Sequence, residues 1–367
     1  MKNNGIFKIE EVDANFAAVS ADGLGEIEWY DAAGGGFDIY GVMHDEDNGF
    51  FRMPPDIAET VSPGVAGLCY HTSGGRIRFS TDSPYIAVIC ENGGCGLMGH
   101  MPLLGSNGFD LYRDGYAGST YAGSAVPPVS EMRENSYFSV IKIKSVNGKT
   151  ENYTLHMPLY GRVKKLLIGI RKGSVLGNGA RYKDIPPVVF YGSSITQGGC
   201  ASRPGLGYTN MISRLLETDT LNLGFSGSAR GERAIREYIA GLDMSAFVSD
   251  YDHNAHSAEE LEMTHYPLYE AVRRTHPDIP YIAVSRPDAR FCDPEDTEKR
   301  RSIIRDTVRR ARDGGDKNVY FIDGAELFDG AGADECTVDG CHPNDIGFMR
   351  MAGKIGAVIA DALGIHL

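Results

Sequence analysis

No stretch of the 367-residue sequence approaches the unbroken apolar run that a membrane-spanning helix needs. Residues 1–8 also lack the apolar block of a secretion signal, so we expect a soluble, cytoplasmic protein. Basic residues are scarce: 36 Lys and Arg stand against 49 Asp and Glu, a formal net charge of -13. Nucleic acid and anionic membrane surfaces bind basic faces, so neither is an expected partner.

Cysteines are few, and their odd number argues against a disulfide framework. Scattered cysteines in a long chain are typical of reduced thiols in a reducing compartment. Their spacing does not match a zinc knuckle, and we expect neither a metal nor an organic cofactor. The seven are Cys69, Cys90, Cys95, Cys200, Cys292, Cys336 and Cys341.

The N-terminal half lacks a helical period of useful length between residues 25 and 170. It shows instead short apolar or alternating runs separated by Gly, Asn and Asp, the pattern of short strands joined by turns. Closely spaced short strands predict an antiparallel β-sandwich or jelly roll. The runs are 37–40, 76–80, 85–90, 138–143 and 166–170.

The C-terminal half alternates strands with amphipathic helices. Residues 171–186 are glycine-rich and basic and predict a connection, so we divide the chain into domains 1–178 and 179–367. Alternation of this kind predicts an α/β fold with a parallel sheet covered on both faces. The expected strands are 187–192, 220–223, 246–248, 280–284 and 319–322, and the expected helices are 208–217, 232–242, 258–275, 295–312 and 345–363.

Polar residues gather in four loops of this second domain. Ligands bind at the carboxyl ends of parallel strands, so loops that follow strands are the places to search. Three of the four loops directly follow an expected strand, and the fourth precedes the last helix. The loops are 191–199, 224–228, 249–254 and 338–344.

Together the four loops resemble the sequence blocks of the SGNH (GDSL-type) hydrolase superfamily, which supply serine, glycine, asparagine and histidine in this order. The resemblance implies a flavodoxin-like α/β/α catalytic domain. It maps the nucleophile onto Ser194, the block glycine onto Gly227 and the block asparagine onto Asn254. The final Asp-x-x-His maps onto Asp339 and His342.

The first and third blocks depart from the family pattern. Ser193 replaces the aspartate of the family name, which is tolerable because the acid partner comes from the last block. Asn254 lies in Asp-Tyr-Asp-His-Asn, so His253 is an alternative polar group for the site. Upstream, residues 108–112 (Gly-Phe-Asp-Leu-Tyr) resemble the Gly-x-Asp-Leu-Tyr signature of an N-terminal β-domain found in one branch of these esterases.

The chemistry of the side chains supports the same roles. A serine hydroxyl needs an adjacent base to attack an ester, and His342 can take the proton from Ser194 and return it to the leaving alcohol. Asp339, three residues earlier, can hold the imidazole in the required tautomer. The backbone N–H groups of Ser194 and Gly227 and the Asn254 amide are the candidate oxyanion donors.

Other polar residues near the blocks are weaker candidates for substrate contact, with surface ion pairs, turns or caps as the alternative. Ser193 and Ser228 are competing serines that suit a turn or helix cap. Residues 250–256 resemble a loose metal-ligand cluster, but the spacing matches no metalloprotease motif. Trp29, Tyr30 and Tyr112 suit a sandwich core better than a sugar-stacking platform. The substrate-contact candidates are Tyr191, Ser193, Arg203, Tyr208, Arg230, Glu232 and His253.

We therefore predict a serine esterase that hydrolyses small acyl esters through an acyl-serine intermediate. The resemblance implies a carbohydrate esterase that removes acetyl groups from a small-molecule or oligosaccharide ester. Three alternatives stay open: an acyltransferase using the same acyl-serine, a non-catalytic carbohydrate-binding protein, and metal-dependent hydrolysis at residues 250–256. A monomer and a homo-oligomer are both compatible with the sequence.

Overall fold

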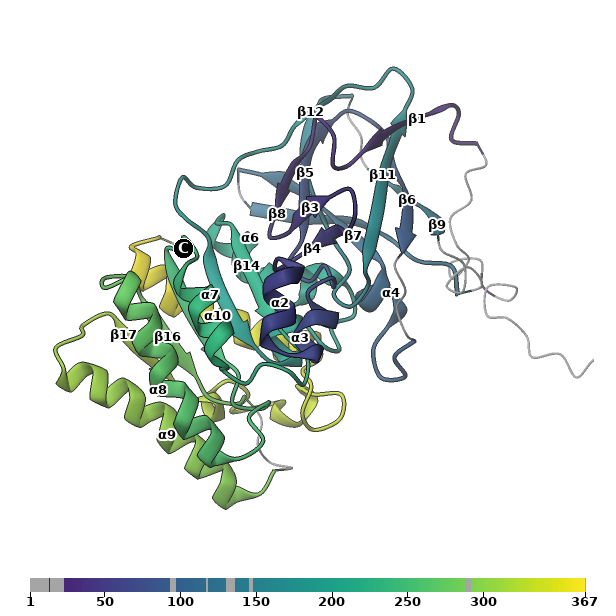
Figure 1. Cartoon of the computed structure of the whole chain (residues 1–367). Coiled ribbons are helices and arrows are strands. Elements are labelled where there is room, and N and C mark those ends of the chain that lie inside the picture. The colour runs from purple at the N-terminus through teal and green to yellow at the C-terminus, as the bar shows by residue number, and fades with distance from the viewer. Residues whose placement is uncertain are drawn as a thin grey trace, which may run out of the picture.

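The computed structural model shows two domains packed against each other (Figure 1). It describes residues 13, 23–92, 97–116, 118–129, 136–144, 148–287 and 292–366. The N-terminal segment 1–8 and Cys95, which entered the sequence predictions, lie outside these ranges. No helix in the described ranges is long and apolar enough to cross a membrane.

The N-terminal domain consists of antiparallel strands in two main sheets, as the sequence predicts. A four-stranded sheet has the order β1 (Ile27–Asp31), β11 (Val163–Arg171), β6 (Tyr85–Asn92) and β9 (Ser136–Lys142). A six-stranded sheet has the order β12 (Leu176–Asn178), β5 (Arg76–Thr81), β10 (Glu151–His156), β7 (Phe109–Gly115) and β8 (Gly118–Ala125), with β2 (Asp38–Tyr40) also paired to β5. The short hairpin β3 (Met43–Asp45) and β4 (Gly49–Phe51) is separate.

Both sheets contribute alternate residues to one apolar core, which makes the domain a sandwich. Ile77 and Phe79 of β5 pack in the same buried cluster as Val88 of β6 and Ile168 of β11. Alternate side chains of a strand point to opposite faces of its sheet, so one face of β5 fills the sandwich. The jelly-roll connection pattern stays a prediction.

The expectation that residues 25–170 contain no helix is wrong. They contain α2 (Pro55–Val61), α3 (Pro63–Leu68) and α4 (Leu103–Asn107). These helices are too short to produce an amphipathic period. The first two begin with proline at the first helical position, and Ser62 caps α3 by accepting from the Val65 N–H.

The C-terminal domain has a five-stranded parallel sheet, which confirms the predicted α/β class. Its spatial order is β14 (Thr220–Gly224), β13 (Val188–Gly192), β15 (Ala246–Asp250), β16 (Tyr281–Val284) and β17 (Val319–Ile322). This is the 2-1-3-4-5 order of flavodoxin-like folds, whose crevice for ligands opens between the first and third strands, here β13 and β15.

Helices cover both faces of this sheet. One face carries α6 (Tyr208–Leu216) and α10 (Asp345–Leu363), which share a buried cluster with apolar residues of the sheet. The opposite face carries α7 (Arg233–Ala240), α8 (Ala258–Thr275) and α9 (Pro294–Asp313), joined there by α2 and α3 of the N-terminal half. The remaining short helices are α5 (Ser194–Gln197), η3 (Pro204–Leu206), η4 (Gly324–Glu326) and η5 (Ala333–Glu335).

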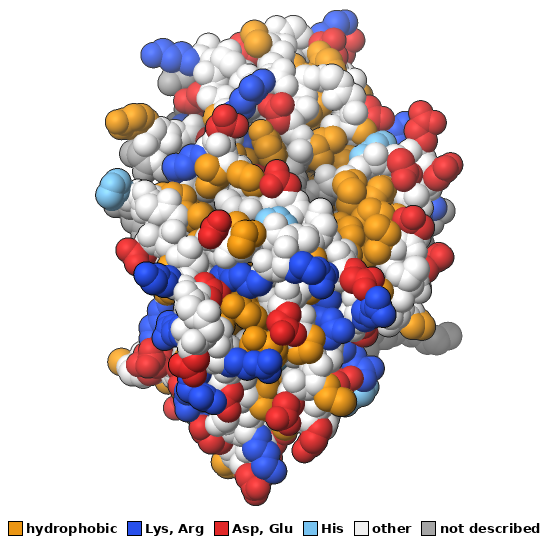
Figure 2. Space-filling view, turned by 60° about the vertical axis from the view of Figure 1, so that its left-hand side comes forward, with side chains coloured by type: hydrophobic (Ala, Val, Ile, Leu, Met, Phe, Trp, Pro, Cys, Tyr) orange, Lys and Arg blue, Asp and Glu red, His pale blue; other side chains and the backbone are white. Residues whose placement is uncertain are grey.

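Charged side chains of both signs mix over the lower part of the molecule in Figure 2, where Figure 1 places α8 and α9. Along α9 these charges form ion pairs, such as Arg301 with Glu298 and Arg309 with Asp306. This face of the molecule therefore mixes both signs of charge, and the expected absence of a nucleic-acid partner stays a prediction.

The Gly-x-Asp-Leu-Tyr signature joins the two domains. Asp110 is fully buried and accepts hydrogen bonds from Arg203 Nη1 at 2.6 Å and from the Gly205 N–H at 2.8 Å. The Tyr112 ring lies under the Arg214 guanidinium, 3.9 Å from its centroid. Residues 203–214 follow the serine block, so the β-domain holds the chain just beyond the nucleophile.

The outer face of β5 makes a second contact between the domains. Arg76 and Arg78 point away from the sandwich core and are buried. Arg76 pairs with Asp219, and Arg78 lies 3.5 Å from Glu217, just ahead of β14. Residues 171–186 connect the domains, but they are not wholly irregular, because β12 pairs with β5.

Candidate active site

The loop after β13 places Ser194 at the carboxyl end of the sheet. Ser193 is the N-cap of α5: it is fully buried and accepts from the Ile195 N–H at 3.2 Å. Ser194 follows as the first helical residue and is partly exposed. Gly192 is required at the turn because a Cβ there would lie 2.0 Å from Thr196 Oγ1. The nucleophile candidate is thus held on a tight strand-to-helix turn.

The turn before α10 brings His342 to this serine from 148 residues away in the chain. Its Nε2 lies 2.9 Å from Ser194 Oγ, and its Nδ1 lies 2.8 Å from Asp339 Oδ2. Asp339 Oδ1 also accepts from the backbone N–H groups of Cys341 and His342 at 3.0 and 2.7 Å. A carboxylate on Nδ1 holds the proton there and leaves Nε2 as the acceptor that faces the serine.

Asp339 is strongly acidic in this turn. Partial burial opposes its ionisation, but the hydrogen bonds from His342 and Cys341 outweigh burial and lower the Asp339 pKa to about 2. The carboxylate is therefore charged at neutral pH, which is the state that stabilises an imidazolium as His342 accepts a proton.

Gly227 and Asn254 flank the serine on neighbouring loops. Gly227 follows β14 with φ +67°, a left-handed conformation that favours glycine, and no atom lies within 4 Å of where its Cβ would be. Asn254 follows β15, and its Oδ1 accepts from the Ala229 N–H at 3.3 Å. That bond fixes the orientation of the Asn254 amide, and its nitrogen is then the atom that can donate to a substrate. Their service as oxyanion donors stays a prediction.

Gln197 connects three parts of the site and was not predicted. Its side-chain oxygen accepts from the Ser226 N–H at 3.0 Å, beside Gly227. Its nitrogen lies 3.0 Å from His71 Nδ1 and 3.2 Å from the Leu159 carbonyl, both in the β-domain. Burial, and secondarily the charge of Arg52, lower the His71 pKa to about 4, which keeps its imidazole neutral and able to accept. The serine loop and the glycine loop are therefore tied together through the β-domain.

Asp250 supports the serine loop through hydrogen bonds to its side chain. It is buried at the end of β15, and its Oδ2 accepts from Thr196 Oγ1 at 3.1 Å and from Tyr208 Oη at 3.2 Å. Burial, reinforced by the nearby Asp252, raises the Asp250 pKa well above its usual value. Tyr208 is fully buried too, so it contacts this carboxyl and not a substrate.

Four weaker substrate-contact candidates make contacts within the protein. Tyr191 is fully buried, and its hydroxyl accepts from the Gly231 N–H at 2.8 Å, because its side chain points to the core face of β13. Ser193 serves as the helix cap described above. Arg203 pairs with Asp110, and Arg230 pairs with Glu260. Full burial leaves Tyr191 and Ser193 no surface for a substrate, whereas substrate contact by the partly exposed Arg203 and Arg230 stays a prediction.

Glu232 and His253 have different surroundings. Glu232 is the residue before α7, where burial raises its pKa and its Oε2 is enclosed. The His253 Nε2 is also enclosed and has no hydrogen-bond partner among the described residues. Burial lowers the His253 pKa to about 4, Asp252 opposes that shift, and the charges of Arg286 and His342 add to it. His253 thus lies near the triad histidine, and its contact with substrate stays a prediction.

The alternative metal loop at residues 250–256 does not converge on one point. Asp250 bonds Thr196 and Tyr208, while Asp252 accepts from the Arg286 N–H at 3.1 Å. Within the described ranges, no group of three potential ligand atoms gathers in this loop. Metal-dependent hydrolysis there has no structural support.

The three aromatic residues of the β-domain have different surroundings. Tyr112 is 5% exposed and lies in the contact between the domains. Trp29 packs edge-on against Phe138, with ring centroids 6.2 Å apart, and Tyr30 packs against the sandwich core. Burial therefore leaves Tyr112 no free face for stacking on a sugar, whereas the roles of the partly exposed Trp29 and Tyr30 stay predictions.

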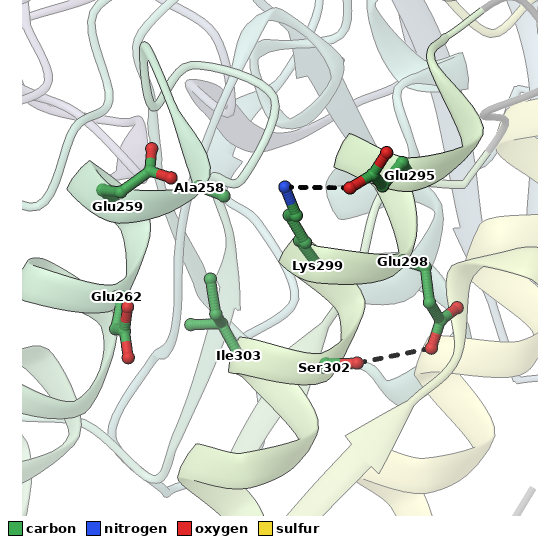
Figure 3. A pocket seen from close by; sticks show the side chains of 8 residues that line it. All are labelled: Ala258, Glu259, Glu262, Glu295, Glu298, Lys299, Ser302 and Ile303. Carbon is green, nitrogen blue, oxygen red and sulfur yellow. Dashed lines mark hydrogen bonds and ion pairs between the residues drawn. The ribbon is translucent and has the colours of Figure 1, made fainter.

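A cavity of about 370 Å³ lies between α8 and α9, apart from the triad (Figure 3). Two of its side-chain contacts are the pairs Lys299 with Glu295 and Ser302 with Glu298. The lining contains no histidine or cysteine, and Ser302 donates its hydroxyl to the Glu298 carboxylate at 3.3 Å. The lining residues are Ala258, Glu259, Glu262, Glu295, Glu298, Lys299, Ser302 and Ile303.

Comparison with known families agrees with this geometry. Residues 186–360 match the GDSL-like Lipase/Acylhydrolase family. Residues 27–176 match the GxDLY family, described as the N-terminus of Esterase_SGNH_hydro-type. The C-terminal half, residues 186–360, belongs to the GDSL-like hydrolases. This assignment places the four blocks and the Gly-x-Asp-Leu-Tyr signature in one GDSL-like hydrolase. A search of curated proteins gives no match.

Solved structures share the two-domain arrangement of this GDSL-like hydrolase. A protein from Bacteroides ovatus described as a GDSL-like lipase is 28% identical, with a TM-score of 0.83 over 93% of this chain and 99% of its own. The salicylyl-acyltransferase SsfX3 of a tetracycline biosynthetic pathway is 19% identical, with a TM-score of 0.75 over 92% and 98%. A family two carbohydrate esterase from Clostridium thermocellum, in complex with cellohexaose, is 16% identical, with a TM-score of 0.59 over 89% and 99%. The last two similarities show the fold alone.

Proposed function

We propose that this protein is a serine esterase that hydrolyses small acyl esters through an acyl-serine intermediate. The observation that carries the proposal is the continuous chain of contacts from Ser194 Oγ through both nitrogens of His342 to Asp339, at 2.9 and 2.8 Å. Three side chains so aligned can activate a hydroxyl that is a weak nucleophile by itself at neutral pH.

The reaction follows from these positions. His342 Nε2 takes the proton as Ser194 Oγ attacks the ester carbon, and the Asp339 carboxylate stabilises the imidazolium. The negative oxygen of the tetrahedral intermediate faces the N–H groups of Ser194 and Gly227 and the Asn254 amide. Collapse expels the alcohol, which takes the proton from His342. Water, activated by the same imidazole, then releases the acid and restores the serine.

An acetylated carbohydrate is the substrate class we propose. The family membership supports an ester, and the fold shared with the Clostridium thermocellum carbohydrate esterase supports a sugar as the alcohol. The acidic surface suits an uncharged substrate. His100 of the β-domain lies beside His342, with ring centroids 5.8 Å apart, so this domain borders the site. Buried thiols such as Cys69 and Cys90 support action in a reducing compartment such as the cytoplasm.

Acyl transfer to an alcohol is the second candidate, favoured by the fold shared with SsfX3. The acyl-serine would pass its acyl group to an acceptor hydroxyl in place of water. Product analysis by mass spectrometry separates the two: the free acid indicates hydrolysis, and an acylated acceptor at equal or greater yield indicates transfer.

The decisive variant is Ser194→Ala. We expect aryl acetate turnover to fall by about 10⁵-fold or more, and labelling by a fluorophosphonate probe to disappear, with the circular dichroism spectrum unchanged. Ser302→Ala, in the distant cavity between α8 and α9, is the matched control and should retain both activities. A pure Ser194→Ala preparation that still turns over substrate refutes the proposal. Acetylated oligosaccharides tested on the same pair of variants then define the alcohol.

A further inference from the structure

A second imidazole and a thiol lie beside the catalytic histidine candidate. His100, Cys200 and His342 each offer one ligand atom, and these atoms all lie within 4.8 Å of one another. His100 is exposed on the turn before α4, Cys200 is buried after α5, and His342 precedes α10. Three loops far apart in the sequence therefore meet at this point.

Cys200 has no part in the esterase mechanism, yet its backbone is unusual. It is 3% exposed and has φ +79°, a left-handed conformation that is rare for a residue with a side chain. Such conformations persist only where the surrounding structure holds them, and they concentrate at functional sites. Here the conformation presents the thiol to the two imidazoles.

We propose that His100, Cys200 and His342 form an inhibitory site for Zn²⁺. Two imidazoles and one thiolate are ligands that Zn²⁺ prefers, whereas Mg²⁺ and Ca²⁺ prefer oxygen. Tetrahedral Zn²⁺ with bonds of about 2.0 to 2.3 Å needs ligand atoms about 3.3 to 3.6 Å apart. His100 is exposed and can supply the closing movement by a change of rotamer. The thiol gives its proton to solvent on binding, and water completes the coordination.

Zn²⁺ would inhibit the enzyme because it binds the His342 nitrogen that catalysis needs, and this step rests on the proposed esterase function. His342 Nδ1 is bonded to Asp339, so Nε2 is the nitrogen that binds the metal. A carboxylate on the other ring nitrogen is the common arrangement of metal-binding histidines. The same Nε2 lone pair accepts the Ser194 proton during attack. Bound Zn²⁺ occupies it and stops the first step of the reaction.

Activity in the presence of Zn²⁺ tests the site. Each variant is compared with its own activity after chelation, so differences in basal rate do not matter. We expect Zn²⁺ to inhibit the unmodified chain and Mg²⁺ to have no effect. His100→Ala and Cys200→Ser should each raise the inhibitory Zn²⁺ concentration by about tenfold or more, because each loses one ligand. His100 is exposed, so His100→Ala keeps the test valid if Cys200→Ser fails to fold.

Cys341→Ser is the matched control, because Cys341 is the residue next to His342 and carries the same group. It should retain the sensitivity of the unmodified chain. Equal Zn²⁺ sensitivity in all variants, or relief in Cys341→Ser alone, overturns the proposed site.

A direct measurement of metal binding distinguishes a failure of the metal-site proposal from a failure of the esterase proposal. Co²⁺ bound by a thiolate absorbs in the near ultraviolet, and we expect that band in a Ser194→Ala protein, which has no turnover. The band should be absent from the double variant that combines Ser194→Ala with Cys200→Ser. It should be present in the double variant that combines Ser194→Ala with Cys341→Ser. Failure of Ser194→Ala to abolish turnover would refute the esterase function, whereas absence of the cobalt band in that protein would refute the metal site.

Discussion

The two sides of the triad are held in different ways. The serine loop is enclosed: Ser193, Thr196 and Gln197 are at most 1% exposed, and partners from both domains bond the loop. The histidine turn lies at the surface, with the His342 and Asp339 side chains 25% and 38% exposed. Tertiary packing therefore positions the nucleophile, whereas bonds within one short turn position its base.

The two sides of the triad should therefore respond differently to mutation. A change beneath the serine loop must disturb a contact between domains and should affect folding as well as activity. A change in the histidine turn should affect activity with little loss of stability, since few buried groups depend on it. The predictions below test that division, beginning with the histidine turn.

Asp339→Asn should produce the largest effect after Ser194→Ala and should leave stability nearly unchanged. An amide in place of the carboxylate loses the charge that supports the imidazolium and permits the wrong tautomer, so kcat should fall by about 10² to 10⁴-fold. Steady-state kinetics with an aryl acetate measure this. Asp361→Asn, at the exposed end of α10, removes the same charge and should retain full activity. A Asp339→Asn protein as active as that control would remove Asp339 from the mechanism.

Asn254 tests the oxyanion assignment on the enclosed side. Loss of one oxyanion donor should lower kcat by about 10² to 10³-fold with a small change in KM. Asn254→Asp keeps the oxygen that accepts from the Ala229 N–H but supplies no amide donor. It should therefore be as impaired as Asn254→Ala. If Asn254→Asp retained activity and only Asn254→Ala lost it, Asn254 would be structural, and His253 would be the next candidate.

Asp110→Asn tests whether the β-domain stabilises the serine side. The buried carboxylate accepts from Arg203 and from the Gly205 N–H, and an amide can satisfy them only in part. The free energy of unfolding in urea should fall by about 1 to 3 kcal/mol. Glu237→Gln breaks the exposed pair with Arg233 and should leave the free energy of unfolding nearly unchanged. Equal effects of the two changes would contradict a specific role for the signature aspartate.

Asn344→Ala should have the smallest effect. Asn344 caps α10 by accepting from the Ile346 and Gly347 N–H groups, and loss of a helix cap costs about 1 kcal/mol. Because the cap lies two residues after His342, we expect a fall in kcat of only a few-fold. Asn344→Asp keeps the capping oxygen and should restore stability in thermal unfolding. A loss of activity as large as that of Asp339→Asn would show that the turn is not self-supporting.

The same contrast explains what the sequence could predict. Asp339 and His342 stand three residues apart, so their contact is local and visible in the motif. The strand and helix alternation of residues 188–363 was also predictable, because each element carries its own hydrophobic period. The short helices near residues 55–68 were missed, since two turns or fewer produce no clear period.

The support of the serine loop could not be predicted in the same way. Gln197 bonds His71 across 126 residues, and nothing in the local pattern of either residue indicates it. Tyr191 was predicted to contact substrate because it lies close to Ser194 in the sequence. Successive side chains of a strand point to opposite faces of the sheet, however, and this alternation directs the Tyr191 ring into the core. The predicted role of Gly227 rested on the motif, whereas its positive φ became visible only in the structure.

Arg52 shows how deeply the two domains depend on each other. It is fully buried, and its guanidinium donates to the Asn222 carbonyl at 2.9 Å and the Gly224 carbonyl at 2.7 Å, at the end of β14, an edge strand of the parallel sheet. A catalytic half expressed alone would leave these carbonyls without their donor and would expose the apolar face that α2 and α3 cover. We therefore expect the hydrolase half to be unstable when it is separated from the β-domain.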